Sequence, residues 1–181
     1  MTDFLESESG QILAGAHKYL SAARIVRYSE QWLRGPTLLQ TPALHLLAHG
    51  IELLLKFPLL QAGVSPEDVG KRYGHDLSRL WNDAHNQATR RLCLDRSDEA
   101  WSEAHASGKW PIDDFNKDPR QELLLALELL GYLHGRESDF ALRYTVAVNT
   151  HAPRPAFLID VFGHVAEHGL KNPRLLTEAF P

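Results

Sequence analysis

The sequence contains one cysteine, Cys93, among its 181 residues, so it cannot form an internal disulfide or a cysteine-based zinc cluster. It is also poor in β-branched apolar residues, because valine and isoleucine together number 12 against 30 leucines. Strands favour β-branched residues and helices favour leucine, so this ratio argues against a sheet protein. The formal charge of −4 excludes a broadly basic nucleic-acid-binding surface but leaves a local basic patch open.

Signals for export and for membrane insertion are also missing. The first ten residues are acidic and hold no apolar run, whereas a signal peptide has a cationic start followed by an apolar stretch. The most apolar region, 44–60, falls short of the run of about 20 apolar residues that spans a bilayer. Four polar residues and a proline interrupt it: His45, His49, Glu52, Lys56 and Pro58. We therefore predict a cytoplasmic protein without a membrane partner.

Prolines that follow a small polar residue mark four helix starts. Such a residue caps free backbone N–H groups, and proline is tolerated in the first turn; the four caps are Thr41, Ser65, Asp118 and Asn172. These caps, together with apolar residues that recur every three or four positions, predict a series of helices. The helices span 9–33, 42–60, 75–94, 97–106, 119–134 and 155–168, and a short one follows 172.

The remaining segments complete the predicted fold. We expect a long loop before residue 118, and only 143–148 has strand character, which is too short to make a sheet. Leucines on several faces of 119–134 predict a central, nearly surrounded helix. The prediction is an all-α bundle of about four main helices, with extra helices and one long loop.

Histidines at helical spacing form a candidate metal site. His45, His49 and Glu52 stand at i, i+4 and i+7 of one predicted helix, and His164 and His168 repeat the four-residue step. Imidazoles one turn apart can share an ion, and zinc or iron suits His and Glu ligands. The alternative is that ten histidines reach such spacings by chance and only make ordinary hydrogen bonds.

A locally basic window spans residues 71–96, which carry a net charge of +3 from six basic and three acidic residues. Tyr73 and Trp81 lie in the same window. Basic residues interleaved with aromatic ones are typical of a phosphate-facing surface, and a solvated helix face is the alternative.

Two segments carry a recognisable pattern. Residues 49–56 read His-Gly-Ile-Glu-Leu-Leu-Leu-Lys, a glycine follows at Gly63, and 73–80 read Tyr-Gly-His-Asp-Leu-Ser-Arg-Leu. The pattern resembles the HEPN family (higher eukaryotes and prokaryotes nucleotide-binding domain), whose members carry Glu-x-x-x-Lys in one helix and Gly-His-Asp-Leu at the opening of the next. Residues 140–144 look like the family's Arg-Tyr-Pro ending, with Thr145 in place of proline.

The resemblance covers about residues 12–145 and implies a single helical domain over 1–181, with 95–117 as an insertion and 149–181 as a C-terminal extension. It further implies a homodimer in a bacterial toxin–antitoxin or defence setting. The implied ligand is RNA, a nucleotide or a partner protein, and no cofactor is implied.

The residues of this pattern also have roles in elementary physical chemistry. Glu52 and Lys56 stand at i and i+4 with the acid first, the better order for a helical ion pair. Gly74 frees the backbone at a turn, His75 can contact a phosphate, and Asp76 suits a helix start. With Arg143, we take Glu52, Lys56, His75 and Asp76 as the candidate ligand-binding site. The alternative is that Gly-His-Asp-Leu only starts and packs a helix.

Many HEPN proteins are metal-independent ribonucleases whose motif is Arg, four to six residues, then His, completed across a dimer. Here only Arg79 and His85 match, a spacing that chance also produces, and they lie on the Gly-His-Asp-Leu helix rather than late in the bundle. Efficient nuclease activity is therefore not expected, and whether the chain is an enzyme stays open. The alternatives are a ribonuclease using Arg79 and His85, with Arg143 on the phosphate, and a helical metalloprotein using His45, His49 and Glu52.

Overall fold

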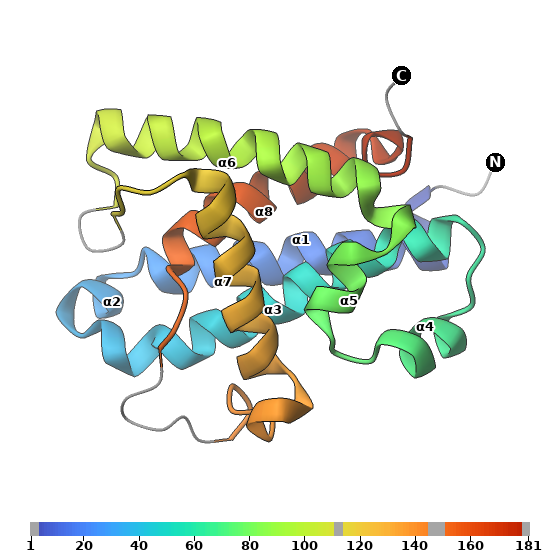
Figure 1. The fold of residues 1–181 in the computed structure, drawn as a ribbon, viewed down its shortest axis with the longest axis horizontal. Coiled ribbons are helices and arrows are strands. Elements are labelled where there is room, and N and C mark those ends of the chain that lie inside the picture. Colours follow the sequence, from blue (N-terminus) through green and yellow to red (C-terminus); the bar gives the residue numbers. More distant parts are fainter. Residues whose placement is uncertain (1–3, 111–113, 145–150, 179–181) are drawn as a thin grey trace.

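The computed structural model describes residues 4–110, 114–144 and 151–178. This part of the chain forms eight α-helices, four short 3-10 helices and no strand, which confirms the all-α class (Figure 1). The α-helices are α1 (Glu8–Arg27), α2 (Glu30–Arg34), α3 (Pro36–Gln61), α4 (Pro66–Tyr73), α5 (Leu77–Asn82), α6 (Gln87–Ser107), α7 (Pro119–His134) and α8 (Pro155–Lys171). The 3-10 helices are η1 (Phe4–Glu6), η2 (Ala84–Asn86), η3 (Arg136–Ser138) and η4 (Pro173–Leu176).

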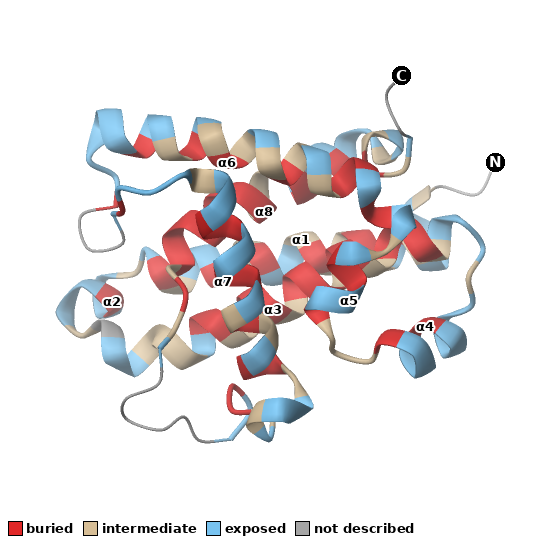
Figure 2. Cartoon of the chain, in the orientation of Figure 1, coloured by how far each residue is buried: buried red, intermediate tan, exposed pale blue. Residues whose placement is uncertain are grey.

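One apolar core joins the long helices. Helices α1 and α3 run antiparallel along the length of the molecule and pack on each other, while α8 packs on α1 and α6 (Figure 1). Helix α7 crosses this layer and contacts α3, α5 and α6. Helices α3 and α8 contribute more buried apolar residues to the interior than the other helices do (Figure 2). Polar side chains that α3 carries into this core therefore need partners from other helices.

Side-chain caps form at two of the four predicted polar–proline pairs, whereas Thr41 lies inside α3 and Asn172 makes no side-chain cap hydrogen bond. The Ser65 Oγ accepts a hydrogen bond from Asp68 N (3.1 Å) and donates one to the Asp68 carboxylate (2.7 Å) at the start of α4. The Asp118 carboxylate accepts from Arg120 N (2.8 Å) and Gln121 N (3.1 Å) at the start of α7. Both positions are confirmed as N-caps.

The first predicted helix, 9–33, is wrong as a continuous element. Helix α1 ends at Arg27 and α2 begins at Glu30. Between them the Ser29 Oγ donates to Val26 O (2.8 Å) and accepts from Trp32 N (3.2 Å), so one hydroxyl serves the end of one helix and the start of the next. A serine side chain can replace backbone hydrogen bonds in this way and so interrupt a helix. The spacing of apolar residues continues across the break and therefore does not reveal it.

The next two helices also differ in their boundaries. Helix α3 begins at Pro36, and Pro42 lies inside it rather than at its start, at the loss of one backbone hydrogen bond. The predicted helix 75–94 is broken at Asp83, whose carboxylate caps η2 by accepting from His85 N (2.9 Å). The predicted 97–106 helix is the continuation of α6, within which Ser97 is buried and donates to Leu94 O (2.7 Å).

Two further expectations concern α7 and the predicted strand. Helix α7 is not surrounded, because Leu124 and Leu125 are 47% and 44% exposed while its other face is buried. Helix α3 is the central element instead. Of the predicted strand 143–148, residues 143 and 144 lie in a turn, and 145–148 lie outside the described residues.

Helix α3 is long and apolar enough, over Thr37–Gln61, to cross a membrane by length and composition. The sequence reasoning missed this because it counted the interrupting polar residues. However, 67% of the most apolar window is buried against the rest of the bundle, as in the core helix of a soluble protein. A cytoplasmic location stays a prediction.

Candidate functional site

The candidate site is built around Glu52, a carboxylate in the middle of the central helix α3. Its side chain is only 2% exposed. Lys56 lies one turn later on the same helix, His75 lies in the turn between α4 and α5, and His134 is the last residue of α7. Three separate segments of the chain therefore place nitrogen donors around one buried carboxylate.

Each carboxylate oxygen of Glu52 has its own partners. Oε1 accepts from Lys56 Nζ at 2.5 Å. Oε2 lies 2.9 Å from His75 Nδ1 and 2.7 Å from His134 Nε2. A buried ionised carboxylate is tolerated only when paired and hydrogen-bonded, and this one is engaged on both oxygens.

These contacts fix the ionisation of Glu52. Burial alone raises the pKa of its carboxyl group, but the His134 hydrogen bond, the Lys56 charge and the His75 hydrogen bond outweigh burial. The net result holds the pKa of Glu52 well below its ordinary range, so the group is a carboxylate at neutral pH.

The carboxylate in turn fixes the tautomer of His75. Because an ionised carboxylate only accepts hydrogen bonds, His75 Nδ1 carries the proton that faces Glu52. Arg143 Nη2 lies 3.0 Å from the other ring nitrogen, Nε2, which can accept from it when neutral. Gly74, with a φ of 54°, makes the turn that brings the ring to this position. Glu52, His75 and Arg143 therefore form a line from the core to the surface.

His49 and His45 lie on the same helix at different distances from the carboxylate. His49 Nδ1 is 4.0 Å from Glu52 Oε2, and its ring packs edge-on against Tyr19 with centroids 4.4 Å apart. The His45 ring lies 6.3 Å from that of His134. Burial lowers the pKa of both histidines; neighbouring His134 and Arg143 lower it further at His45, whereas Glu52 opposes the shift at His49. Both rings therefore favour the neutral form.

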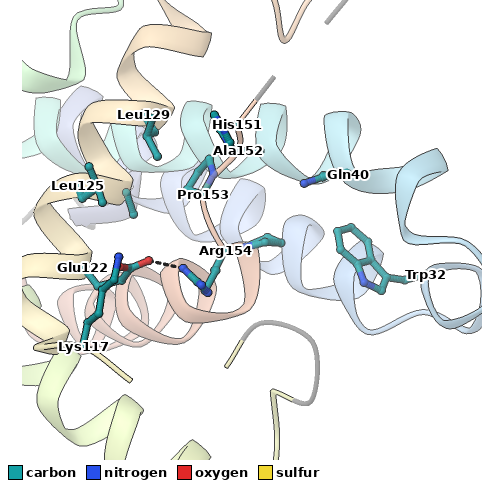
Figure 3. Close-up of a pocket in the computed structure, with 12 residues that line it drawn as sticks. Trp32, Gln40, Lys117, Glu122, Leu125, Leu129, His151, Ala152, Pro153 and Arg154 are labelled. Carbon is teal, nitrogen blue, oxygen red and sulfur yellow. Dashed lines mark hydrogen bonds and ion pairs between the residues drawn. The ribbon is translucent and has the colours of Figure 1, made fainter. Parts of the chain in front are cut away.

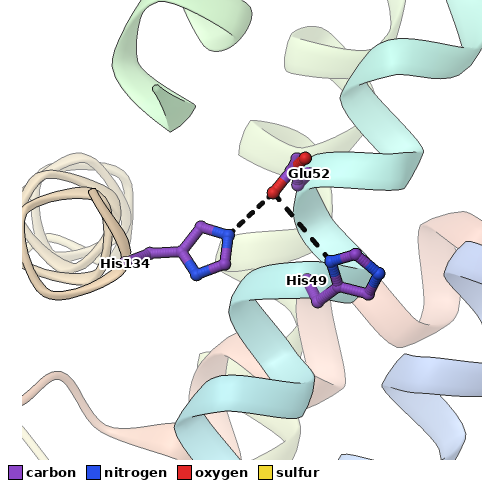
Figure 4. A group of neighbouring side chains, drawn as sticks. All are labelled: His49, Glu52 and His134. Atoms are coloured by element: carbon purple, nitrogen blue, oxygen red, sulfur yellow. Dashed lines mark hydrogen bonds and ion pairs between the residues drawn. The ribbon is translucent and has the colours of Figure 1, made fainter. Parts of the chain in front are cut away.

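One group of side chains in the described residues has the composition of a metal site. The donor atoms of His49, Glu52 and His134 all lie within 4.8 Å of one another (Figure 4). The sequence grouped His45 with His49 and Glu52, but the structure brings His134 of α7 to this group instead. Lys56 competes with any cation, because its ammonium already occupies Oε1 of Glu52.

The other predicted site residues lie elsewhere. Asp76 caps α5 by accepting from Arg79 N (2.9 Å), which is the role of a helix start. His85 Nδ1 is 2.7 Å from the Asp83 carboxylate, which also accepts from the Tyr73 hydroxyl, and Arg79 lies over the Tyr73 ring at 5.9 Å. Arg79 and His85 are therefore linked through Tyr73 and Asp83. No described contact joins either residue to the Glu52 cluster.

The basic window 71–96 is largely engaged within the protein. Lys71 pairs with Glu67 at 2.5 Å, and Arg96 donates two hydrogen bonds of 2.7 Å to Glu103. Arg90 donates to the carbonyl oxygens of Trp81 and Asp83. These contacts favour the interpretation as a structural and solvated helix face over a phosphate-facing surface.

The sequence reasoning missed His134, the only one of the three close partners of Glu52 that lies far along the chain. It ends a leucine-rich helix and belongs to no spacing pattern, so no local signal marks it. A histidine that ends an apolar helix and is followed by Gly135 points into the bundle only because of how α7 crosses α3. His164 and His168, the second pair, lie on α8 with ring centroids 4.0 Å apart and ring planes tilted by 38°, and the group of possible metal ligands found among the described residues does not include them.

No protein-family model, no curated protein and no solved structure matches this chain. The resemblance to the HEPN family therefore stays a prediction that rests on the quoted residues alone.

Proposed function

We propose that the protein binds a phosphate group of RNA or of a nucleotide at the Glu52 cluster, as a HEPN-like helical protein without efficient nuclease activity. The pairing of charges is the observation that carries this proposal. Glu52 is engaged by Lys56 and the histidines, whereas Arg143 has no carboxylate partner among the described residues. The cluster thus has surplus positive charge at its exposed end, and a guanidinium fork suits phosphate oxygens.

Aromatic side chains beside Arg143 favour a ligand that carries a base. The Arg143 guanidinium lies 4.9 Å from the ring centroid of Phe140. Tyr144, the residue after Arg143, is 77% exposed. Unpaired bases stack on exposed rings and on guanidinium planes. This arrangement supports single-stranded RNA or a nucleotide as the ligand class, rather than a simple inorganic anion.

Fluorescence anisotropy with a labelled single-stranded RNA of mixed sequence tests the proposal in the presence of EDTA. We expect Arg143→Ala to weaken binding and to lower the slope of log K against log salt by about 0.7, the value of one single-strand phosphate contact. Arg174→Ala is the matched control, because this arginine is also exposed but lies in η4. Binding that is equal in both variants, or absent for both RNA and free nucleotides at low salt, would contradict the proposal.

A ribonuclease activity is the second candidate, and the orientation of His75 favours it. With Nδ1–H held by Glu52, Nε2 of the neutral ring accepts the proton of a ribose 2′-hydroxyl once Arg143 turns from Nε2 to the phosphate. The 2′-oxygen then attacks phosphorus, and the bond to the 5′-oxygen breaks as that oxygen takes a proton from water. Arg143 then stabilises the charge on the phosphate. Cleavage of RNA in EDTA that His75→Gln abolishes and His85→Ala leaves unchanged would support these residues; the reverse pattern would favour Arg79 and His85.

A metal site is the third candidate. The donor atoms of His49, Glu52 and His134 can converge on one zinc or iron ion after small adjustments, because ligands of a tetrahedral ion lie about 3.4 Å apart. Metal analysis of the purified protein decides this candidate. About one equivalent of metal per chain in the wild type and in His45→Ala, and its loss in His134→Ala, would support the site. Less than about a tenth of an equivalent in the wild type would rule it out.

The resemblance also implies a homodimer, a toxin–antitoxin or defence setting, and a partner protein as another possible ligand. Helix α3 offers little surface for a dimer, because most of its apolar face is buried within the chain; Leu38, near its start, is 82% exposed. Sedimentation of the purified protein measures the oligomeric state directly.

A further inference from the structure

A second polar site lies away from the Glu52 cluster, where α7 meets the start of α8. It is a pocket of about 600 Å³, within the range of small-molecule sites, and its wall includes Glu122 of α7, Arg154 before α8 and Trp32 of α2 (Figure 3). Glu122 and His134 are twelve residues apart on one helix, or about 18 Å, so this pocket is separate from the Glu52 cluster.

Glu122 is a buried carboxylate with only one oxygen in use. It is 5% exposed, and Oε1 accepts a hydrogen bond from Arg154 Nη1 at 2.5 Å. Oε2 is buried as well, yet no described group hydrogen-bonds to it, and the ammonium of Lys117 lies 3.9 Å away. A buried carboxylate oxygen without a hydrogen bond is costly, so a small rotation of the Glu122 carboxylate that brings Oε2 to a donor in the pocket would be favourable.

Cationic groups flank the same carboxylate. The Arg154 side chain is 37% exposed and lies over the Phe115 ring at 5.5 Å, while the Lys117 side chain is 64% exposed. With Glu122 counted, these three side chains carry a net charge of +1. An anionic group placed beside Arg154 and Lys117 would therefore be attracted, next to the point where Glu122 needs a donor.

The rest of the pocket wall is mainly apolar. Leu125 and Leu129 of α7 and Pro153 line it, and Trp32 bounds the end opposite Glu122 and Lys117 (Figure 3). Leu125 is 44% exposed and therefore offers apolar surface to a ligand in the pocket. The Trp32 Nε1–H is also buried without a described acceptor. The pocket thus joins one acceptor and two cations at one end to an apolar body.

We propose that this pocket binds an α-amino acid with an apolar or aromatic side chain. The ligand's ammonium group donates to Glu122 Oε2, its carboxylate lies between Arg154 and Lys117, and its side chain packs against Leu125 and Leu129. An ammonium and a carboxylate on one carbon match the adjacent acceptor and cations, and the zwitterion brings no net charge into the pocket.

Isothermal titration with L-phenylalanine as the probe tests this proposal on the full chain. We expect saturable binding, and we expect N-acetyl-L-phenylalanine to bind at least about tenfold more weakly, because its amide N–H carries no positive charge and its acetyl group is placed against the buried Glu122 Oε2. L-Phenylalaninamide, which lacks the carboxylate, should also bind more weakly. Because these comparisons change the ligand and not the protein, they do not depend on how a variant folds.

Protein variants then locate the site. Lys117→Ala changes an exposed side chain and should weaken L-phenylalanine binding several-fold without altering the circular dichroism spectrum. Lys171→Ala, on the far end of α8, is the matched control and should leave binding unchanged. No saturable heat up to about 10 mM L-phenylalanine, or equal binding of the N-acetyl derivative, would overturn the proposal.

Discussion

The Glu52 cluster allows a quantitative prediction about burial, because an exposed Glu–Lys pair elsewhere in the chain has the same spacing and the same contact distance. Glu52 and Lys56 stand at i and i+4 with a 2.5 Å contact, and so do Glu67 and Lys71. The Glu52 side chain is 2% exposed and that of Lys56 16%, whereas those of Glu67 and Lys71 are 75% and 70% exposed. The local geometry is thus matched, and the surroundings alone differ.

We expect Glu52→Gln to lower the free energy of unfolding by about 3–5 kcal/mol at pH 7, because it leaves a largely buried ammonium without its anion and turns an NH2 group toward other donors. Glu67→Gln should cost less than about 0.5 kcal/mol, since water replaces the lost partner. Urea unfolding followed by circular dichroism measures both values. A cost below about 1 kcal/mol for Glu52→Gln, or an equal cost for both variants, would refute the argument from burial.

The same carboxylate sets an acid limit to the stability of the wild-type protein. The pKa of Glu52 in the folded state lies below the ordinary value of 4.5, so its contribution is complete above that value and is lost as the pH falls toward the folded-state pKa. The difference between the wild type and Glu52→Gln should therefore shrink in acid below about pH 4.5. A difference that stays constant down to the acid transition would contradict the assignment of the shift to Glu52.

Two further predictions concern packing and reactivity. Gly50→Ala on α3 should destabilise the fold by about 1–3 kcal/mol, because the new Cβ would lie 2.7 Å from Leu20 Cγ of α1. Gly163→Ala on α8, whose Cβ would meet no atom within 4 Å, should stabilise the fold by up to about 1 kcal/mol. Thermal unfolding measures both effects, and equal effects would count against close packing of α1 on α3. Burial raises the pKa of the Cys93 thiol, so the thiol should resist alkylation at pH 8 in the native protein and react once the protein is unfolded in urea. Rapid alkylation of the native protein would instead show that α6 opens.

The sequence by itself determined the features that depend on near neighbours in the chain. The shortage of β-branched residues and the leucine spacing predict the helices, and Ser65 and Asp118 mark two of their starts, because capping and apolar periodicity act within a few residues. The pairing of Glu52 with Lys56 is also local, since one helical turn separates them. The break at Ser29 was within reach of the same reasoning, but a serine serves equally in a helix interior or at an end until its backbone partners are known.

Only the tertiary structure decided which side chains meet across helices. His134 reaches Glu52 from 82 residues away, and Arg143 reaches His75 across 68 residues. No periodicity records such pairs, because they depend on the angle at which α7 crosses α3 and on the turn at Gly74. The buried Oε2 of Glu122, which lacks a hydrogen-bond donor, and the pocket around it likewise arise where α2, α7 and α8 converge. Local rules place a residue on a helix face, and the packing of helices decides what that face meets.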